Sequence, residues 1–205
     1  MTVIIDYGVG NLFSLTSSFR KIGAEVTVSN DPDVIKSADR LILPGVGAFK
    51  DAADKLRQSG LDKILIAKAD AGCPILGICL GMQLLFEKSF EYGEHEGLGL
   101  LKGDIVPFKG AIEESLKIPH IGWNSLKKRD DCPLFKYIKN GDFVYFVHSF
   151  YAPFEIESRA ATSDYGIPFT AAVQDGNIFG CQFHPEKSGD VGLNILRAFI
   201  EIGEN

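Results

Sequence analysis

Residues 74–81 read Pro-Ile-Leu-Gly-Ile-Cys-Leu-Gly, and this stretch decides the fold. Its first half is a short apolar run typical of a buried strand, and a nearly all-apolar run follows, which predicts a helix over Leu80–Lys88. The form glycine-x-nucleophile-x-glycine between a strand and a helix is the nucleophile-elbow pattern, here with Cys79 in place of serine. Side chains two residues from the nucleophile would collide in so sharp a turn, which Gly77 and Gly81 avoid.

The cysteine at the centre of this pattern is a candidate nucleophile. The turn places the sulfur of Cys79 at the start of the following helix, whose free backbone N–H groups favour the reactive thiolate. The turn also lies beyond the carboxyl end of a strand, where open α/β sheets bind their ligands. A buried cysteine between two packing glycines is the alternative interpretation.

Short apolar runs alternate with helical patterns in the first half of the chain. The strands are expected at residues 3–5, 26–28, 41–43 and 75–78, with helices after Asn11, Asp31 and Ala48. This alternation predicts an α/β fold with a mostly parallel central sheet flanked by helices and right-handed crossovers.

The second half changes character. Turn formers separate several short strand-like runs, which predicts a largely antiparallel part before a last helix over Ser188–Ile202. These runs are 99–108, 143–147, 156–162, 169–173 and 177–183. The length of 205 residues and the absence of a linker pattern predict a single domain over residues 1–205.

The composition argues against two classes of partner. The formal net charge of −6 does not favour a nucleic-acid-binding surface, and Lys127-Lys128-Arg129 is expected to be a solvated turn. No apolar run reaches the roughly 18 residues of a membrane span. The four cysteines form no C-x-x-C pair, and the chain shows no signal-peptide pattern, so we expect a cytoplasmic protein.

A cysteine hydrolase also needs a histidine that takes and returns protons. His95 lies in a Glu- and Gly-rich segment and is expected to be solvated. His148 and His184 each end a strand-like run, and a carboxylate two residues beyond His184, Glu186, could hold its second ring nitrogen. Spacing favours His184 over His148 but leaves both open.

The charge that develops in acyl transfer needs N–H donors. The amide of Leu80 is the first candidate, and the loop at Pro44-Gly45-Val46-Gly47 is the second, with Val46 and Gly47 as donors. An ordinary strand-to-helix turn is the alternative for that loop. Gly8-Val9-Gly10 is a weak nucleotide-binding candidate, because Phe13 stands where a third glycine belongs.

Taken together, two segments of the chain, Gly77–Gln83 and Phe183–Glu186, resemble the triad-type (class I) glutamine amidotransferases, which have a flavodoxin-like fold. Five further segments narrow the resemblance to the glutaminase subunits of imidazole glycerol phosphate synthase, an enzyme of histidine biosynthesis. They are Asp6–Asn11, Leu43–Phe49, Pro119–Asn124, Phe146–Ser149 and Gln182–Ser188. Phe150 departs from the tyrosine of many relatives, with little consequence for an expected backbone contact.

The resemblance implies a Cys-His-Glu triad of Cys79, His184 and Glu186. It further implies glutamine bound near Gln83, Ser149 and Phe150, without cofactor or metal. The released ammonia is expected to pass through a channel to a partner, a (β/α)8-barrel cyclase (lyase) subunit in a heterodimer. There it joins a phosphoribosyl-formimino intermediate, giving imidazole glycerol phosphate and aminoimidazole carboxamide ribonucleotide. The docked face is expected to hold Asn11, Trp123, Tyr145 and Lys187.

Several alternatives remain at this level. Trp123, the only tryptophan, can be an interface anchor or a core residue. The Pro44–Gly47 loop is expected to switch orientation, so that the lone chain is a slow glutaminase. Rival functions are the glutaminase of pyridoxal phosphate synthesis, a free-standing cysteine hydrolase and a non-enzymatic binding protein.

Overall fold

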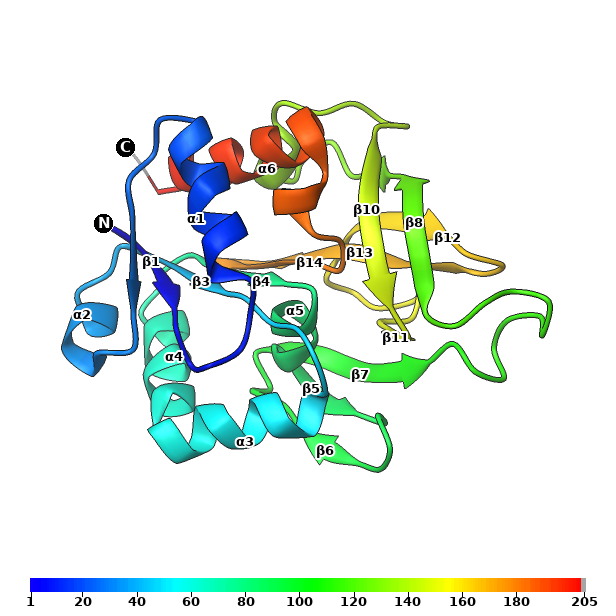
Figure 1. Ribbon diagram of the computed structural model, residues 1–205, viewed down its shortest axis with the longest axis horizontal. Helices are drawn as coiled ribbons and strands as arrows, with labels where there is room; N and C mark the ends of the chain where they lie inside the picture. The colour runs from blue at the N-terminus through cyan, green and yellow to red at the C-terminus, as the bar shows by residue number, and fades with distance from the viewer. Residues whose placement is uncertain (204–205) are drawn as a thin grey trace.

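An eight-stranded sheet with strand order β2-β1-β3-β4-β14-β13-β12-β9 forms the centre of the computed structural model, which describes residues 1–203 (Figure 1). Strands β2 to β14 in this order run parallel, and the last three pair antiparallel. The bounds are β1 (Thr2–Ile5), β2 (Val26–Ser29), β3 (Arg40–Leu43), β4 (Ile75–Ile78), β14 (Ile178–Cys181), β13 (Pro168–Asp175), β12 (Arg159–Asp164) and β9 (Lys127–Lys128). The predicted mostly parallel sheet is confirmed.

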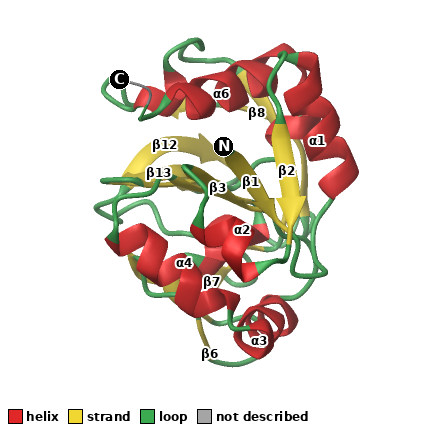
Figure 2. Ribbon diagram, turned by 90° about the vertical axis from the view of Figure 1, so that its left-hand side faces the viewer, coloured by secondary structure: helices red, strands yellow, loops and turns green. Residues whose placement is uncertain are grey.

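Helices cover both faces of this sheet (Figure 2). One face carries α1 (Leu12–Lys21) and α6 (Gly189–Glu201), and the other carries α2 (Pro32–Lys36), α3 (Phe49–Ser59), α4 (Leu61–Asp70) and α5 (Leu80–Leu84). Successive side chains of a strand point to opposite faces. Ile4 therefore packs with the α1 and α6 side chains, while Val3 and Ile5 pack with those of α2, α3 and α4.

Two smaller sheets complete the arrangement. One has the strand order β11 (Phe150–Tyr151), β7 (Leu101–Pro107), β5 (Phe86–Ser89) and β6 (His95–Glu96); the other pairs β10 (Phe143–His148) with β8 (His120–Ser125). Two 3₁₀ turns, η1 (Pro133–Phe135) and η2 (Pro185–Lys187), complete the elements. Within residues 1–203, no helix has the length and apolar character needed to cross a bilayer.

The helix expected over Leu80–Lys88 is wrong in its second half. Helix α5 ends at Leu84, and Phe86 begins β5. The segment after β6 takes the carbonyl groups at the helix end: the amide of Leu98 donates to the Leu84 carbonyl and that of Gly99 to the Phe86 carbonyl. These bonds join residues distant from the helix, so local apolar periodicity could not reveal them.

Three further expectations need correction. The run 177–183 is expected in the antiparallel half, but β14 pairs parallel with β4 on one side and antiparallel with β13 on the other. The sequence pattern of residues 120–125 predicts no strand, but these residues form β8. Lys127 and Lys128 form the edge strand β9 paired to β12, not a turn.

Candidate active site

Cys79 lies on the turn between β4 and α5, and its backbone has a strained conformation with φ 54° and ψ −111°. Such a conformation is costly for a residue with a side chain and is typical of functional sites. A Cβ atom on Gly77 would lie 2.7 Å from the Gly81 carbonyl oxygen, and one on Gly81 would lie 1.8 Å from the Leu43 carbonyl oxygen. The predicted sharp turn between strand and helix and the steric role of its two glycines are confirmed.

Sheet topology brings His184, the candidate base, to this cysteine. Strand β14 is the parallel neighbour of β4, with Cys181 beside Ile78, so the segment that follows β14 emerges next to the elbow. There His184 Nδ1 lies 2.8 Å from Glu186 Oε1, and both side chains are buried. This contact leaves the other ring nitrogen, Nε2, for the Cys79 sulfur.

The electrostatics of His184 suit a proton carrier. Burial by itself would lower its pKa, but the Cys79 sulfur and the Glu186 carboxylate, as hydrogen-bond partners, outweigh burial and raise the pKa from 6.5 to about 10. The ring is therefore protonated at neutral pH, with the Cys79 sulfur and the Glu186 carboxylate as its hydrogen-bond partners. A protonated histidine beside a cysteine sulfur is an arrangement that can activate a cysteine nucleophile.

One backbone hydrogen bond and one hydroxyl hold His184 in place. The Ser188 hydroxyl donates to the His184 carbonyl at 2.6 Å and accepts from the Tyr145 amide at 2.9 Å. The His184 amide in turn donates to the Tyr145 carbonyl at 2.9 Å. The role of Ser188 was missed in the sequence, because a serine before a helix signals only a cap.

His148, the competing candidate, is also close to the site, but its ring nitrogens are engaged elsewhere. Nδ1 donates to the Phe150 carbonyl at 2.9 Å, and Nε2 lies 3.1 Å from His120 Nδ1. Burial lowers the pKa of His148 to about 3. The geometry thus favours His184 over His148 as the base, in agreement with the position of Glu186 two residues after His184 in the sequence.

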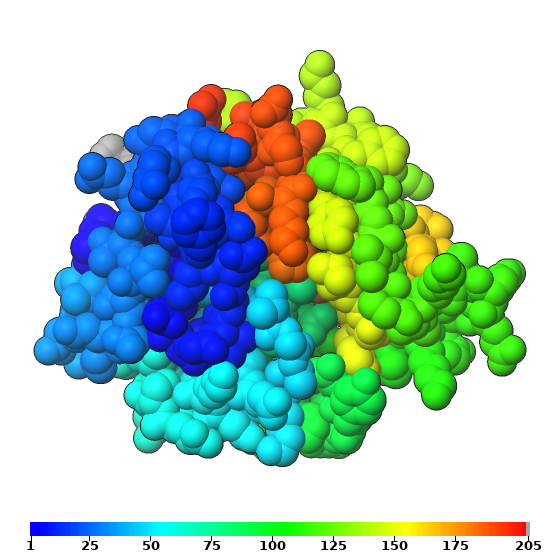
Figure 3. All heavy atoms as spheres, viewed as in Figure 1, coloured from blue at the N-terminus to red at the C-terminus, as the bar shows by residue number. Residues whose placement is uncertain are grey.

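A cavity of about 290 Å³ brings most of the candidate residues together. Its size is close to the lower end of the range for small-molecule sites. Figure 3 shows the molecular surface hollowed where the cyan segment near residue 47 meets the orange and yellow segments. The lining residues are Val46, Gly47, Cys79, Leu80, Gln83, Glu91, Pro119, Val147, His148, Ser149, Phe150 and His184.

Glu91 is a lining residue that sequence reasoning missed. One of its carboxylate oxygens, Oε2, accepts a hydrogen bond from the Phe49 amide at 2.5 Å. It puts a carboxylate on a cavity that already holds the Cys79 sulfur. Glu91 lies in an acidic, glycine-rich stretch whose pattern resembles an ordinary solvated loop, so no local signal marked it.

Gln83 is buried and makes two internal hydrogen bonds. Its Nε2 donates to the Phe150 carbonyl at 3.1 Å and to Gln182 Oε1 at 2.9 Å. Gln182 Nε2 in turn lies 3.8 Å from the Cys79 sulfur. Gln83 therefore supports the wall of the cavity, and its amide nitrogen is already occupied.

The loop expected to supply oxyanion donors lies against the elbow. A Cβ atom on Gly45 would lie 2.7 Å from the Gly81 amide nitrogen, so only glycine permits this approach. Gly47 has a positive φ of 92°. The buried Tyr7 hydroxyl donates to the Pro44 carbonyl at 2.7 Å and ties the loop to the end of β1.

Three of the four expected interface residues form one cluster. Trp123 is 51% exposed, so its interpretation as a core residue is wrong. Its ring meets the Tyr145 ring edge-on at 5.9 Å, and Lys187 Nζ lies 5.8 Å from the centre of the Tyr145 ring.

Asn11, the fourth expected interface residue, lies near His184. Its side chain caps α1 by accepting from the Ser14 amide at 3.2 Å, and it lines a small cavity with His184 and Glu186. Glu186 Oε2 is buried and has no hydrogen-bond partner within residues 1–203.

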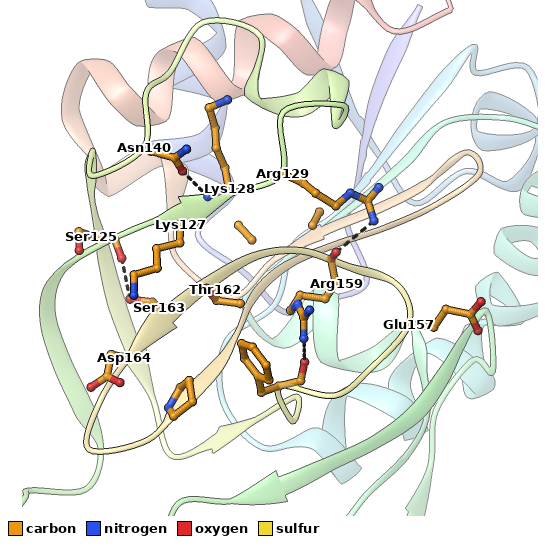
Figure 4. A pocket seen from close by; sticks show the side chains of 14 residues that line it. Ser125, Lys127, Lys128, Arg129, Asn140, Glu157, Arg159, Thr162, Ser163 and Asp164 are labelled. Atoms are coloured by element: carbon orange, nitrogen blue, oxygen red, sulfur yellow. Dashed lines mark hydrogen bonds between the residues drawn. The ribbon is translucent and has the colours of Figure 1, made fainter.

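A larger cavity of about 710 Å³ lies over β9 and β12 and contains none of the predicted site residues (Figure 4). It is rich in basic side chains, but most of them are already paired. Lys128 Nζ lies 2.8 Å from Asp130, Arg129 Nε lies 2.7 Å from Asp131, and Arg159 donates to the Phe154 carbonyl. Size therefore does not mark the reactive site of this chain.

Comparisons with known proteins agree with this geometry. The sequence model of the family "Glutamine amidotransferase class-I" matches residues 3–202. "Imidazole glycerol phosphate synthase subunit HisH" of Wolinella succinogenes is 49% identical, over 99% of this chain and 100% of the relative. The protein of the same name from Bacillus licheniformis is 51% identical, over 97% and 95% of the two chains.

Solved structures share the fold at low sequence identity. A structure described as "Crystal structure of glutamine amidotransferase" superposes with a TM-score of 0.77 at 17% identity and covers 99% of both chains. "Structure of PurLQS from Thermotoga maritima" gives 0.75 at 21% identity, over 98% of this chain and 97% of that one. The flavodoxin-like arrangement expected for class I amidotransferases is thereby confirmed.

Proposed function

We propose a function from one premise: the chain belongs to the class-I glutamine amidotransferase family. It is thus an amidotransferase enzyme, and we infer that it hydrolyses glutamine to glutamate and ammonia as the glutaminase subunit of imidazole glycerol phosphate synthase. One observation carries the chemistry: a strained Cys79 shares a cavity with His184, which Glu186 holds at 2.8 Å. The identities of 49–51% to subunits of that synthase support the assignment to histidine biosynthesis.

In the first half of the reaction, the Cys79 thiolate attacks the side-chain amide carbon of glutamine. The carbonyl oxygen becomes an oxyanion, and we expect the amides of Leu80, Val46 and Gly47, which line the cavity, to stabilise it. The His184 imidazolium then gives its proton to the amide nitrogen. The C–N bond breaks, ammonia leaves and a thioester to Cys79 remains.

In the second half, water replaces ammonia. Neutral His184 takes a proton from the attacking water, which adds to the thioester carbon. The C–S bond breaks, glutamate leaves, and the thiolate and imidazolium are restored. Glu186 keeps Nδ1 of the ring protonated throughout, so that Nε2 carries every proton transfer.

The cavity offers recognition for the amino-acid end of glutamine. Glu91 is the carboxylate on its wall and is suited to the α-ammonium group of the substrate. Ser149 and Phe150 also line the cavity, and Gln83 supports this part of the wall through the Phe150 carbonyl. Replacing Glu91 with glutamine should raise the KM for glutamine more than it lowers kcat.

Ammonia made in this cavity needs a protected route. In neutral water ammonia is largely protonated to ammonium, which has no free lone pair and is not a nucleophile. We therefore propose that the cluster of Trp123, Tyr145 and Lys187, with Asn11, docks a (β/α)8-barrel cyclase subunit in a cytoplasmic heterodimer and that ammonia passes directly into it. The exposed aromatic anchor Trp123 fits such a contact.

The proposal is tested by glutamate release from the purified chain, alone and with the cyclase subunit loaded with its ribonucleotide substrate. We expect a large rise on addition of the loaded partner and complete loss in Cys79→Ala. Release that does not change with the partner would contradict the subunit assignment. Release that survives in Cys79→Ala would contradict the proposed nucleophile.

A further inference from the structure

A pair of buried histidines, one of which, His148, lines the glutamine cavity, has no part in the proton transfers described above. Antiparallel pairing of β8 with β10 places His120 directly opposite His148. Their facing nitrogens, His120 Nδ1 and His148 Nε2, are 3.1 Å apart. Both side chains are buried, with 1% and 6% of their residue surface exposed.

The acceptor at the end of this pair determines where each hydrogen lies. The Phe150 carbonyl can only accept, so His148 must carry its hydrogen on Nδ1. Burial lowers the pKa of His148 to about 3, so the ring is neutral and its Nε2 is an acceptor. His120 Nδ1 must then be the donor to His148.

The outer end of the pair meets the side chain of Asn124. Asn124 Nδ2 donates to the Asp164 carbonyl at 2.9 Å, so its amide oxygen faces His120 Nε2 at 2.8 Å. This orientation suits a protonated His120, which donates from both ring nitrogens. A neutral His120 keeps its hydrogen on Nδ1 when the Asn124 amide turns over, which costs only the exposed hydrogen bond to Asp164.

An aromatic cage shields these bonds from water. The His120 ring stacks on Tyr165 at 4.1 Å and on Phe146 at 5.2 Å, and Phe108 and Phe169 close the remaining sides. In such surroundings an unpaired donor or acceptor is costly. The pair is therefore held in one hydrogen-bond arrangement.

The last hydrogen bond of the pair reaches the Phe150 carbonyl, in the wall of the glutamine cavity. The Phe150 carbonyl accepts from His148 Nδ1 at 2.9 Å and from Gln83 Nε2 at 3.1 Å. Two donors from different elements thus fix one carbonyl, and with it the backbone of the segment Ser149–Phe150 that lines the cavity.

We propose that His120 and His148 are positioning residues for glutamine binding, because His120 fixes the His148 tautomer that holds the Phe150 carbonyl. The inference rests on the proposed function for its substrate. It concerns binding of glutamine, so its main effect falls on KM and not on kcat.

Two substitutions of His120 separate positioning from packing. In His120→Asn the amide nitrogen stands one bond beyond Cγ, as Nδ1 does in histidine, so the donor is kept while the aromatic ring is lost. In His120→Phe the ring is kept and the donor is lost. A positioning role predicts that the asparagine variant binds glutamine better, whereas a packing role predicts the reverse.

Glutamine affinity is measured by titration calorimetry in a Cys79→Ala background, where the substrate stays intact, and KM is measured in chains that keep Cys79. One neutral hydrogen bond of about 0.5–1.5 kcal/mol corresponds to a weakening of about 3- to 10-fold for His120→Phe. His120→Asn should stay within about 2-fold of its parent. Equal weakening in both variants, or none in His120→Phe, would overturn the inference.

A second measurement is independent of catalysis and of variant folding. Nitrogen-15 NMR of the histidine rings in the unaltered chain should show His148 neutral with its hydrogen on Nδ1 from pH 7 to about pH 5. The titratable neighbours His120 and His184 both lower the pKa of His148 and so oppose a positive charge on its ring. A hydrogen on Nε2, or protonation above pH 5, would refute the proposed pair. Failure of the Cys79→Ala chain to bind glutamine, with the tautomer as expected, would instead count against the proposed function.

Discussion

The hydroxyl of Tyr7 makes a contact whose loss can be followed in both stability and catalysis. It donates to the Pro44 carbonyl at 2.7 Å, and only 7% of the Tyr7 surface is exposed. Burial, reinforced by the nearby Cys79, raises the pKa of Tyr7, so the hydroxyl remains a donor at all working pH values. Tyr7→Phe removes this donor and leaves the ring in place.

The expected cost follows from the burial of both partners. A typical hydrogen bond contributes about 0.5–1.5 kcal/mol net, and a buried acceptor left without a partner costs about 1–3 kcal/mol. We expect Tyr7→Phe to lower the free energy of unfolding by about 1–3 kcal/mol in urea titration. The loop from Pro44 to Gly47 should loosen as a result. Since losing a whole oxyanion donor costs about 10²–10³ in kcat, a loosened loop should cost less, about 10-fold.

Tyr137→Phe is the matched control. Its hydroxyl donates to Glu201 at 2.7 Å on the surface, so its loss should change neither the free energy of unfolding nor kcat appreciably. Glutamate release is measured with the loaded cyclase partner, and unfolding in urea with the chain alone. If Tyr7→Phe were as stable and as active as Tyr137→Phe, the reasoning about the loop would be refuted. A loss of stability without a loss of kcat would refute only the link to the oxyanion donors.

Three further predictions concern the elbow and the base. Gly81→Ala would place a Cβ atom 1.8 Å from the Leu43 carbonyl oxygen. We expect this variant to have a free energy of unfolding in urea lower by at least about 1–3 kcal/mol, and its Cys79 to be alkylated more slowly by iodoacetamide. Ser188→Ala removes the donor to the His184 carbonyl, and we expect a several-fold lower kcat at nearly constant KM in steady-state assays. Glu186→Gln should cut kcat by about 10²–10⁴. It should also move the alkaline limb of the pH profile to lower pH, because the carboxylate helps to raise the pKa of His184 to about 10 and the protonated ring must donate to the leaving ammonia. An unchanged alkaline limb would contradict that role.

Local sequence determined the parts of the site that lie next to one another in the chain. The elbow needs only a strand, a helix and two glycines around Cys79, all within a few residues. The pairing of His184 with Glu186 likewise spans two residues, and the structure places their side chains 2.8 Å apart. The alternation of apolar runs and helical patterns predicted the parallel sheet, because each run buries its own side chains.

Contacts between distant segments decided the rest. Helix α5 stops at Leu84 because the loop around Gly99 takes the carbonyls at its end. Glu91 reaches the cavity, and Tyr7 reaches the oxyanion loop, only through neighbours far away in the chain.

Even the choice between the two strand-end histidines needed the tertiary structure or the resemblance, because spacing left both possible. Sheet pairing places His184 beside the elbow and His148 against His120. The sequence by itself thus determined the candidate nucleophile, its turn and the central sheet, whose causes are steric and local. Only the tertiary structure showed the cavity walls, the buried histidine pair and which histidine lies beside the elbow, because those depend on strand order and on which polar groups are buried together.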